Sequence, residues 1–270
     1  MFLAILGWIR TNGSAVLGVL LLTACVRAET ITLVADQWCP YNCDPAAERP
    51  GFMVEIAQRA FAAEGIEVVY LTLPWLRALQ ATAHGSYDAV IGASVIEARG
   101  FVFPDIEQAR MRNGIWALQG RAWQYAGVDS LKQVRLGATG GYSYGPAVER
   151  YLNHPDNAAG VTLLFGDEPL SRGISMLKRG RLDALLEDEQ VMRYALRQSG
   201  EENALVLAGL VENTDEFSKI YIAFSSAREN SDKYARILSE QTRRLRQSGE
   251  LHDILAHYNL TDWQPSPMPH

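Results

Sequence analysis

The chain has 270 residues, a formal net charge of −6 at pH 7, 48% hydrophobic residues and 21% charged residues. This length is sufficient for one large domain or two small ones, and the composition is ordinary for a globular protein. The mildly acidic balance, without a basic face, excludes nucleic acid as an expected partner and weighs against tight binding to anionic lipid surfaces.

Residues 1–28 have the pattern of an export signal. Arg10 precedes an apolar run, Ala15 to Ala24, that is too short to span a bilayer reliably. Leu22-Thr-Ala-Cys25 resembles a lipobox that would place a lipid on Cys25, whereas Val26-Arg-Ala28 fits cleavage by ordinary signal peptidase. An uncleaved anchor is a third alternative. All three predict a folded part outside the cytoplasmic membrane, so we expect a periplasmic protein, either free or anchored through lipid.

Strand and helix patterns alternate over the first third of the folded chain. We expect strands over Thr30–Asp36, Ile66–Leu73 and Ala89–Gly92, with helices over Met53–Ala63 and Trp75–Ala83 between them. This alternation predicts a parallel sheet with crossover helices. A further apolar strand, Ile115-Trp-Ala-Leu118, ends at Gly120 before a polar stretch, and we place the first crossing between two lobes there.

A second α/β unit follows, and the chain then returns to the first. Its expected strands lie near residues 134–138, 161–164, 184–186 and 204–207. Lys219–Phe224 reads as the returning strand, followed by a long helix from Ser231 that stops at Gly249 and a closing helix over 251–258. We therefore assign residues 29–118 and 219–260 to the first lobe, 119–218 to the second, and 261–270 to a poorly ordered tail. Two crossing strands permit closure about a cleft.

Cys39 and Cys43 lie four residues apart in Trp38-Cys-Pro-Tyr-Asn-Cys43. Because an exported protein folds in an oxidising compartment, we expect a local disulfide that stiffens a binding loop. Metal binding is a weaker alternative, since no His or second Cys pair lies nearby in the sequence. We expect no metal and no cofactor.

Two segments each read as a buried strand that ends in a charged residue. The segment from Asp88 ends in the positively charged Arg99, and the segment from Gly180 ends in the negatively charged Asp188. Ligands of open α/β sheets bind at the carboxyl ends of the strands, and a guanidinium facing a carboxylate suits a zwitterion such as an α-amino acid. Taken alone, Arg99 would be a surface arginine and Asp188 a helix N-cap.

Four landmarks carry a resemblance to a known family through their order and spacing. They are Asp36–Tyr41 with Pro50–Glu55, Pro74–Leu79 leading to Arg99, Leu136–Ser143, and Asp183–Asp188 with the later Ser248–Leu255. The chain from Thr30 to Tyr258 resembles a bacterial extracellular solute-binding protein of family 3, an amino-acid-receiving component of ABC import systems. The resemblance implies a two-lobed, type II periplasmic-binding-protein-like α/β fold and a monomer that delivers a small amino-acid-like ligand to an ABC permease, without enzymatic activity.

The resemblance also implies which side chains bind the ligand. The expected residues are Asp36, Trp38, Ser94, Arg99, Tyr142, Ser143 and Asp188. It assigns the ligand carboxylate to Arg99, to the Ser94 hydroxyl and to backbone N–H groups of the glycine-rich loop 139–143, and the ligand ammonium to Asp188. Trp38 and Tyr142 would supply aromatic surface, and Asp36 would set its loop or touch a polar end of the ligand. Glu187 and Glu189 are expected to lie on neighbouring faces, outside the site.

Two other functions stay open at this point. Some relatives of this fold are cyclohexadienyl or arogenate dehydratases, and such an enzyme would need a buried general acid, for which Glu187 or Asp188 is the available source. The two lobes could alternatively sense a ligand and signal to a separate membrane receptor.

Overall fold

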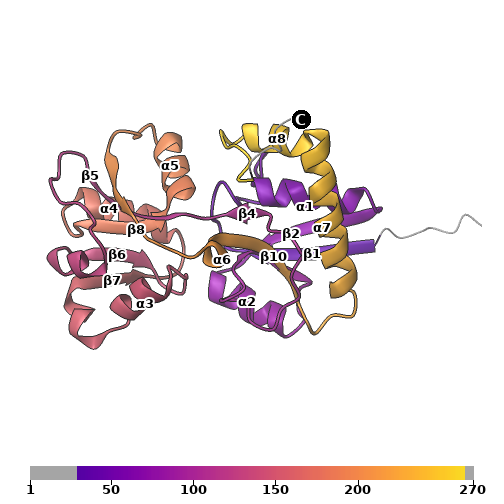
Figure 1. Cartoon of the computed structure of the whole chain (residues 1–270), viewed down its shortest axis with the longest axis horizontal. Helices are drawn as coiled ribbons and strands as arrows, with labels where there is room; N and C mark the ends of the chain where they lie inside the picture. The colour runs from indigo at the N-terminus through magenta and orange to yellow at the C-terminus, as the bar shows by residue number, and fades with distance from the viewer. Residues whose placement is uncertain (1–28, 265–270) are drawn as a thin grey trace, which may run out of the picture.

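A computed structural model describes residues 29–264, which form two lobes placed side by side along the longest axis (Figure 1). Each lobe contains a five-stranded mixed sheet covered by helices, so the predicted two-lobed α/β fold is confirmed. The proposed export signal, including Cys25, lies outside the described residues. No helix within residues 29–264 is long and apolar enough to cross a membrane.

The sheet of the first lobe has the strand order β2-β1-β3-β10-β4. Its strands are β1 (Glu29–Ala35), β2 (Ile66–Thr72), β3 (Ala89–Ala93), β4 (Ala109–Arg110) and β10 (Lys219–Phe224). Strands β1, β2 and β3 are parallel, as the alternation of strand and helix predicts. Strand β10, which returns from the other lobe, lies between β3 and β4 and runs antiparallel to both.

Helices cover both faces of this sheet. They are α1 (Phe52–Ala62), α2 (Trp75–Ala83), α7 (Ser231–Ser248) and α8 (Glu250–Ala256). The main core lies under α1, α7 and α8 and includes Phe61, Phe224 and Leu238, whereas Trp75 and Ala78 of α2 pack in a separate cluster. Helix α7 ends at Gly249 in the left-handed conformation, as expected for a glycine C-cap.

The second lobe has the same pattern of strands, in the order β7-β6-β8-β5-β9. Its strands are β5 (Asn113–Leu118), β6 (Leu136–Thr139), β7 (Val161–Leu164), β8 (Ala184–Asp188) and β9 (Leu205–Leu210). Its helices are η1 (Val128–Gln133), α3 (Pro146–Leu152), η2 (Pro155–Gly160), α4 (Pro169–Lys178) and α5 (Glu189–Gln198). Strands β6, β7 and β8 are parallel, and β5 lies antiparallel between β8 and β9.

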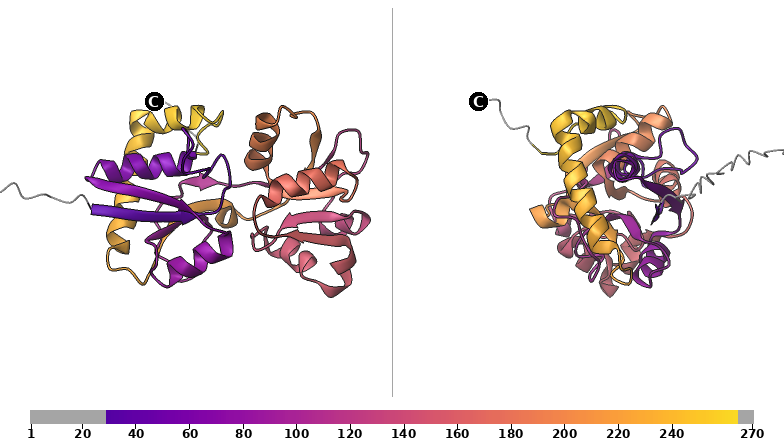
Figure 2. Two further views of the ribbon diagram at one scale, coloured as in Figure 1. Left: turned by 180° about the vertical axis from the view of Figure 1, so that it is seen from behind. Right: turned by 90° about the vertical axis from the view of Figure 1, so that its right-hand side faces the viewer.

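The first crossing lies earlier in the chain than the sequence indicated. We expected the strand up to Leu118 to close the first lobe, but β5 pairs with β8 and β9 and belongs to the second sheet. The chain therefore crosses at residues 111–112, between β4 and β5. It returns between β9 and β10, through α6 (Asp215–Ser218), and the two connections run side by side in the middle of the molecule (Figures 1 and 2).

The segment after the last helix is ordered as far as it is described. We expected the tail from Thr261 to be poorly ordered, but Asp262 pairs with Arg246 at 2.6 Å and Trp263 donates its indole N–H to Glu107 at 3.1 Å. The Arg246 guanidinium also lies 5.2 Å from the centre of the Trp263 ring. Residues 261–264 thus strap the end of the chain to the first lobe, and residues 265–270 lie outside the described part.

Candidate ligand-binding site

A cavity lies at the junction of the two lobes. It is lined by Asp36, Trp38, Asn42, Trp75, Ile91, Gly92, Glu97, Met111, Asn113, Tyr142, Ser143, Tyr144 and Glu187. Its volume of about 30 Å³ is enough for a group the size of a water molecule or an ammonium. Five of these residues, Asp36, Trp38, Trp75, Tyr142 and Glu187, also line a wider cleft of about 760 Å³. The deep cavity can thus hold the head of a small ligand whose remainder lies in the cleft.

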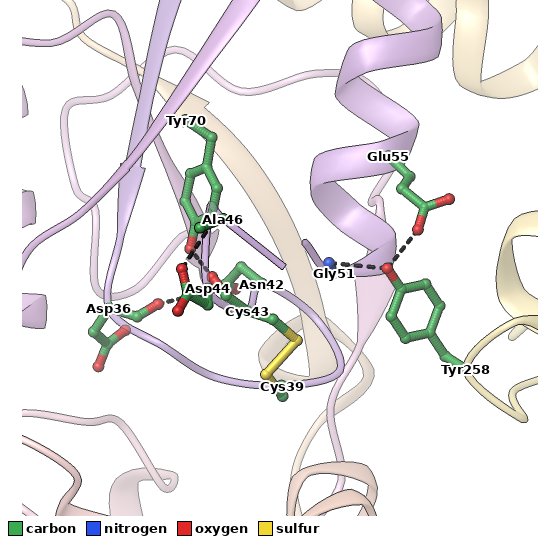
Figure 3. The surroundings of a disulfide bond; sticks show 10 residues. All are labelled: Asp36, Cys39, Asn42, Cys43, Asp44, Ala46, Gly51, Glu55, Tyr70 and Tyr258. Atoms are coloured by element: carbon green, nitrogen blue, oxygen red, sulfur yellow. Dashed lines mark hydrogen bonds between the residues drawn. A yellow bond between two sulfur atoms is a disulfide. The ribbon is translucent and has the colours of Figure 1, made fainter. Parts of the chain in front are cut away.

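The loop after β1 forms one wall of this cavity and is closed by the predicted disulfide between Cys39 and Cys43 (Figure 3). The Asn42 side-chain amide donates to the Asp36 carbonyl at 2.5 Å, and the Tyr70 hydroxyl donates to the Cys43 carbonyl at 3.0 Å. These contacts fix the loop from several sides. As a result, Trp38 and Asn42 are presented to the cavity from a rigid support.

Aromatic donors join the two lobes through the carboxyl groups of the cavity. The Trp38 indole N–H donates to Glu187 Oε1 at 3.1 Å, and the Tyr142 hydroxyl donates to Asp36 Oδ2 at 2.5 Å. The Trp38 and Tyr142 rings meet edge to face with their centres 6.3 Å apart. Trp38, Tyr142 and Asp36 were all expected at the site, and the structure brings them together there.

Glu97 lies where the resemblance placed the ligand carboxylate. Its Oε2 accepts the backbone N–H of Ser94 at 3.2 Å and the Ser94 hydroxyl at 2.8 Å, and its Oε1 accepts the backbone N–H of Ser143 at 3.2 Å. Ser94 and Ser143 are therefore brought together as expected, from different lobes. The carboxylate they bind belongs to the protein.

Arg99 does not lie at the cavity. It is exposed on the turn that follows β3, and it is not among the residues that line the deep cavity or the wider cleft. Within this turn Ser94 binds Glu97, whose carboxyl group also reaches Ser143 of the second lobe, and two residues later Arg99 faces solvent. The expected pairing of Arg99 with a ligand in the cavity is absent from this arrangement.

Asp188 is fully buried and acts as the N-cap of α5. Its Oδ1 accepts the backbone N–H groups of Gln190 and Val191 at 2.8 and 3.1 Å and the Tyr41 hydroxyl at 3.2 Å, and its Oδ2 accepts the backbone N–H of Arg112 at 2.7 Å. Three backbone N–H groups therefore occupy the carboxylate, together with the Tyr41 hydroxyl, which also donates to the Arg110 carbonyl at 2.9 Å. The helix-cap alternative describes Asp188, and the two opposite charges do not converge on one gap.

Glu187 takes the place at the cavity that was expected for Asp188. Successive side chains of a strand point to opposite faces, so only one of these two neighbours can face the cleft. Glu187 is 2% exposed and, besides the bond from Trp38, accepts the backbone N–H of Asp188 at 2.9 Å. Its side chain was expected to lie on a neighbouring face, and this expectation was wrong.

Two asparagines line the cavity with a polar atom that no other described group satisfies. Asn42 is 1% exposed and its Oδ1 has no hydrogen-bond partner, and Asn113 is 2% exposed and its Nδ2 has none. Buried polar atoms are normally paired, so these two atoms are open to a water molecule or to a polar group of a ligand in the cavity. Neither asparagine, nor Glu97, was predicted from the sequence, because their access to the cavity depends on how the two lobes meet.

The carboxyl groups of the cavity are less acidic than usual because they are withdrawn from water. Burial raises the pKa of Asp36 to about 6, that of Glu97 to about 7 and that of Glu187 to about 8. Hydrogen bonds from Tyr142, Ser94 and Trp38 oppose these shifts without cancelling them. Near neutral pH the cavity is therefore poised to exchange protons with a ligand.

No group of three or more His, Cys, Asp or Glu side chains within residues 29–264 is arranged to hold a metal ion. Two lobes that share a cavity at their junction, connected by two crossings, define a protein of the binding-protein class, in which a small solute lies between the lobes. The chain belongs to the bacterial extracellular solute-binding proteins, family 3, whose model matches residues 31–261. This family consists mainly of non-enzymatic solute-binding proteins that act outside the cytoplasm.

Several solved structures share the fold at low sequence identity. The amino acid ABC transporter substrate-binding protein AbpA of Streptococcus pneumoniae, bound to L-arginine, is 16% identical with a TM-score of 0.68, covering 85% of this chain and 94% of that one. A structure described with glutathione import via GshT and the cystine ABC importer TcyBC of Streptococcus mutans is 16% identical with a TM-score of 0.71, covering 89% and 98%.

A sensor protein is also among the structural neighbours. A histidine kinase sensor domain with similarity to periplasmic binding proteins is 20% identical with a TM-score of 0.68, covering 87% of this chain and 99% of that one. A search of curated protein sequences finds no match. At these identities the likeness establishes the fold alone.

Proposed function

We propose that this protein is an exported solute-binding protein that captures a small, nitrogen-bearing polar solute, an amino acid or close analogue, between its lobes and delivers it to an ABC permease. The observation that carries the proposal is the cavity at the junction, whose walls come from both lobes. Asp36 and Trp38 belong to one lobe and Tyr142 and Glu187 to the other, and all four line both the cavity and the cleft.

Capture would proceed by a shift in the population of open and closed forms. A ligand that touches both lobes binds the closed form more tightly and so favours it. The short crossings at residues 111–112 and 211–214 are the places where the lobes can turn relative to each other. Closure would present a surface built from both lobes to the membrane partner, and lipid on Cys25 would keep the protein near it.

A transport partner and a sensory partner both agree with the known structures, since both occur among proteins of this fold. We favour the transporter because the family model describes solute-binding proteins over most of the chain. Copurification of the mature protein with a permease complex reconstituted in lipid nanodiscs, and ligand uptake by that complex, would support this assignment. Binding of the liganded protein to a receptor ectodomain, without uptake, would reassign it to signalling.

One observation favours the enzyme alternative. Glu187 is a buried carboxyl group at the cavity, and its raised pKa keeps it largely protonated at pH 7, as a general acid requires. Arogenate and related acids, however, carry carboxylates, and none of the side chains that line the cavity is cationic in the described structure. Incubation with arogenate or prephenate, followed by chromatography, tests this alternative, and phenylalanine or phenylpyruvate as a product would establish it.

A thermal-shift screen of the mature protein tests the binding function. Ligand that binds the native state alone must raise the apparent melting temperature, by an amount that grows with ligand concentration. The panel should contain amino acids, their decarboxylated amines, polyamines and small organic acids. A saturable shift with at least one compound supports the proposal, and no shift with any compound at millimolar concentration contradicts it.

A further inference from the structure

The carboxyl group of Glu97 accepts the hydrogen bonds that were expected to go to the carboxylate of an amino-acid ligand. The Ser94 hydroxyl, the Ser94 backbone N–H and the Ser143 backbone N–H all donate to Glu97. A ligand carboxylate placed there would have to displace Glu97 or lie beside it, and two carboxylates in contact repel each other. The protein thus supplies from its own chain the anion that an amino acid would bring.

Among residues 29–264, no positively charged side chain lines the cavity to receive a second carboxylate. The described residues lining the deep cavity, the wider cleft and the adjoining cleft beside Glu149 include no Lys, Arg or His. Arg112, which lies in the first crossing, is paired with Glu189, and Arg110 is paired with Glu107 and Asp215. A carboxylate entering this region would lose its water without gaining a charged partner.

The remaining groups suit a cation. Asp36, Glu97 and Glu187 supply carboxyl oxygens to the deep cavity, and Asp167 and Glu168 lie at the wider cleft. Trp38, Trp75, Tyr142 and Tyr144 also line the deep cavity, and aromatic rings can attract ammonium and guanidinium groups through their faces. Acidic walls of this kind also raise the local concentration of cationic solutes.

The unsatisfied asparagine atoms give a second, independent indication of a ligand. Asn42 Oδ1 is a buried acceptor to which no group within residues 29–264 donates, and a ligand N–H group in the cavity would supply a donor. Asn113 Nδ2 is a neutral donor that can serve a hydroxyl, ether or carbonyl oxygen of the ligand. Neither requires a charged carboxylate.

We propose that the solute is a small organic cation without a carboxylate, either an amine or a guanidine, whose charged head enters the deep cavity among Asp36, Glu97 and Glu187. This inference rests on the proposed binding function and narrows its substrate class. Glu97 then determines specificity: it contributes to binding the cation and blocks the place where the carboxylate of an amino acid would lie.

Matched pairs of compounds that differ only by a carboxylate test this proposal on the wild-type protein. The pairs are putrescine and L-ornithine, cadaverine and L-lysine, and agmatine and L-arginine, titrated by calorimetry at pH 7.5. We expect at least one amine to bind at least tenfold more tightly than its amino acid. Tighter binding of the amino acid in every pair that binds would overturn the inference and leave the binding function standing.

Two further outcomes separate the failure of the inference from the failure of the function. If no member of the pairs binds but a neutral or anionic solute from the thermal-shift panel does, the solute is not a cation and the binding function stands. If no compound of the matched pairs or of the thermal-shift panel binds to the folded protein, both the inference of a cationic solute and the proposed binding function are contradicted.

The Glu97→Gln variant tests the specificity role directly. We expect the affinity for the preferred amine to fall at least tenfold and the preference over the matching amino acid to narrow, because the variant removes the negative charge of residue 97. Glu240→Gln changes the same functional group at an exposed position on α7 and should leave both affinities unchanged. An unchanged amine-to-amino-acid ratio in folded Glu97→Gln would refute the role of Glu97.

Discussion

Glu187 and Asp188 are neighbours in the sequence, yet they have separate tasks because β8 points them to opposite sides. The carboxylate of Asp188 accepts hydrogen bonds from backbone N–H groups at the start of α5 and from the backbone N–H of Arg112 in the first crossing. Glu187 faces the cavity and accepts a hydrogen bond from Trp38. A single position along a strand therefore separates a structural carboxylate from one that can meet a ligand.

Asp188→Ala should destabilise the protein without changing its ligand preference. Loss of an N-cap costs about 1–2 kcal/mol of unfolding free energy, and the Tyr41 hydroxyl and Arg112 N–H also lose an acceptor. We expect thermal denaturation to show a melting temperature several degrees lower, with the ratio of amine to amino-acid affinity unchanged. The exposed Asp232→Ala change on α7 is the control. A large loss of affinity at full stability would return Asp188 to the ligand site.

Arg99→Ala should leave ligand affinity within about threefold of the wild-type value, since a surface charge outside the site contributes little. Calorimetric titration with the preferred amine measures this directly. A tenfold or greater loss would show that Arg99 reaches the ligand after closure and would restore the original assignment.

Glu187→Gln should weaken the dependence of amine affinity on pH. Because the pKa of Glu187 is raised to about 8 and that of Glu97 to about 7, both carboxyls lose protons as pH rises from 6 to 8.5, and a cation then binds more tightly. The affinity of the wild type should increase over this interval, and titrations in buffers of different ionisation enthalpy should detect proton release. In Glu187→Gln the increase above pH 7 should be smaller, because Glu97 still titrates there, and Glu240→Gln should behave as the wild type.

At the scale of elements, the loop between β1 and α1 decides how the first lobe presents its part of the site. The disulfide between Cys39 and Cys43 closes a short loop that contains Asn42, and Trp38 directly precedes this loop. Tyr70 of β2 donates a hydrogen bond to the carbonyl of Cys43 (Figure 3). The positions of Trp38 and Asn42 therefore depend on a short, crosslinked turn.

The double variant Cys39→Ser, Cys43→Ser tests this support. A loop of this length contributes about 2 kcal/mol of chain-entropy stabilisation. We expect a melting temperature several degrees lower and a weaker affinity for the ligand, because Trp38 and Asn42 lose their fixed positions. Unchanged affinity in the folded variant would show that the remaining hydrogen bonds hold the loop without the disulfide.

Much of the fold could be predicted because it depends on local patterns. The helix Trp75–Ala83 and the strand Lys219–Phe224 were predicted with the bounds that the structure has. The lobe membership of β5 could not be predicted, since an apolar strand carries no sign of which sheet it joins. Glu187 and Glu97 line the cavity in place of the predicted Asp188 and Arg99. Which of two nearby side chains faces the cavity depends on the facing of the strand and the geometry of the turn, and a single position in the sequence does not show either.

At the scale of the whole molecule, the buried carboxyl groups between the lobes make the free energy of unfolding depend on pH. The pKa values of Asp36, Glu97 and Glu187 are raised in the folded state, to about 6, 7 and 8. The folded protein thus binds more protons than the unfolded chain over roughly pH 4–8, and its unfolding free energy falls as the pH rises. Asp88 and Asp183, whose pKa values are lowered, act in the opposite sense only at more acidic pH.

The melting temperature of the ligand-free protein should therefore be highest near pH 5 and decrease steadily toward pH 8.5. Differential scanning calorimetry across this interval measures it, and Glu187→Gln should flatten the decrease at its alkaline end. A melting temperature that rises from pH 5 to pH 8 would mean that these carboxyls are ionised in the folded protein at ordinary pH.

The most direct test is a crystal structure of the protein with agmatine bound. We predict that the guanidinium or the amine contacts Asp36 and Glu187 in the deep cavity while Glu97 keeps its bonds to Ser94 and Ser143. A structure in which Glu97 has swung away, or in which the ligand lies outside the cavity against Arg99, would contradict the account.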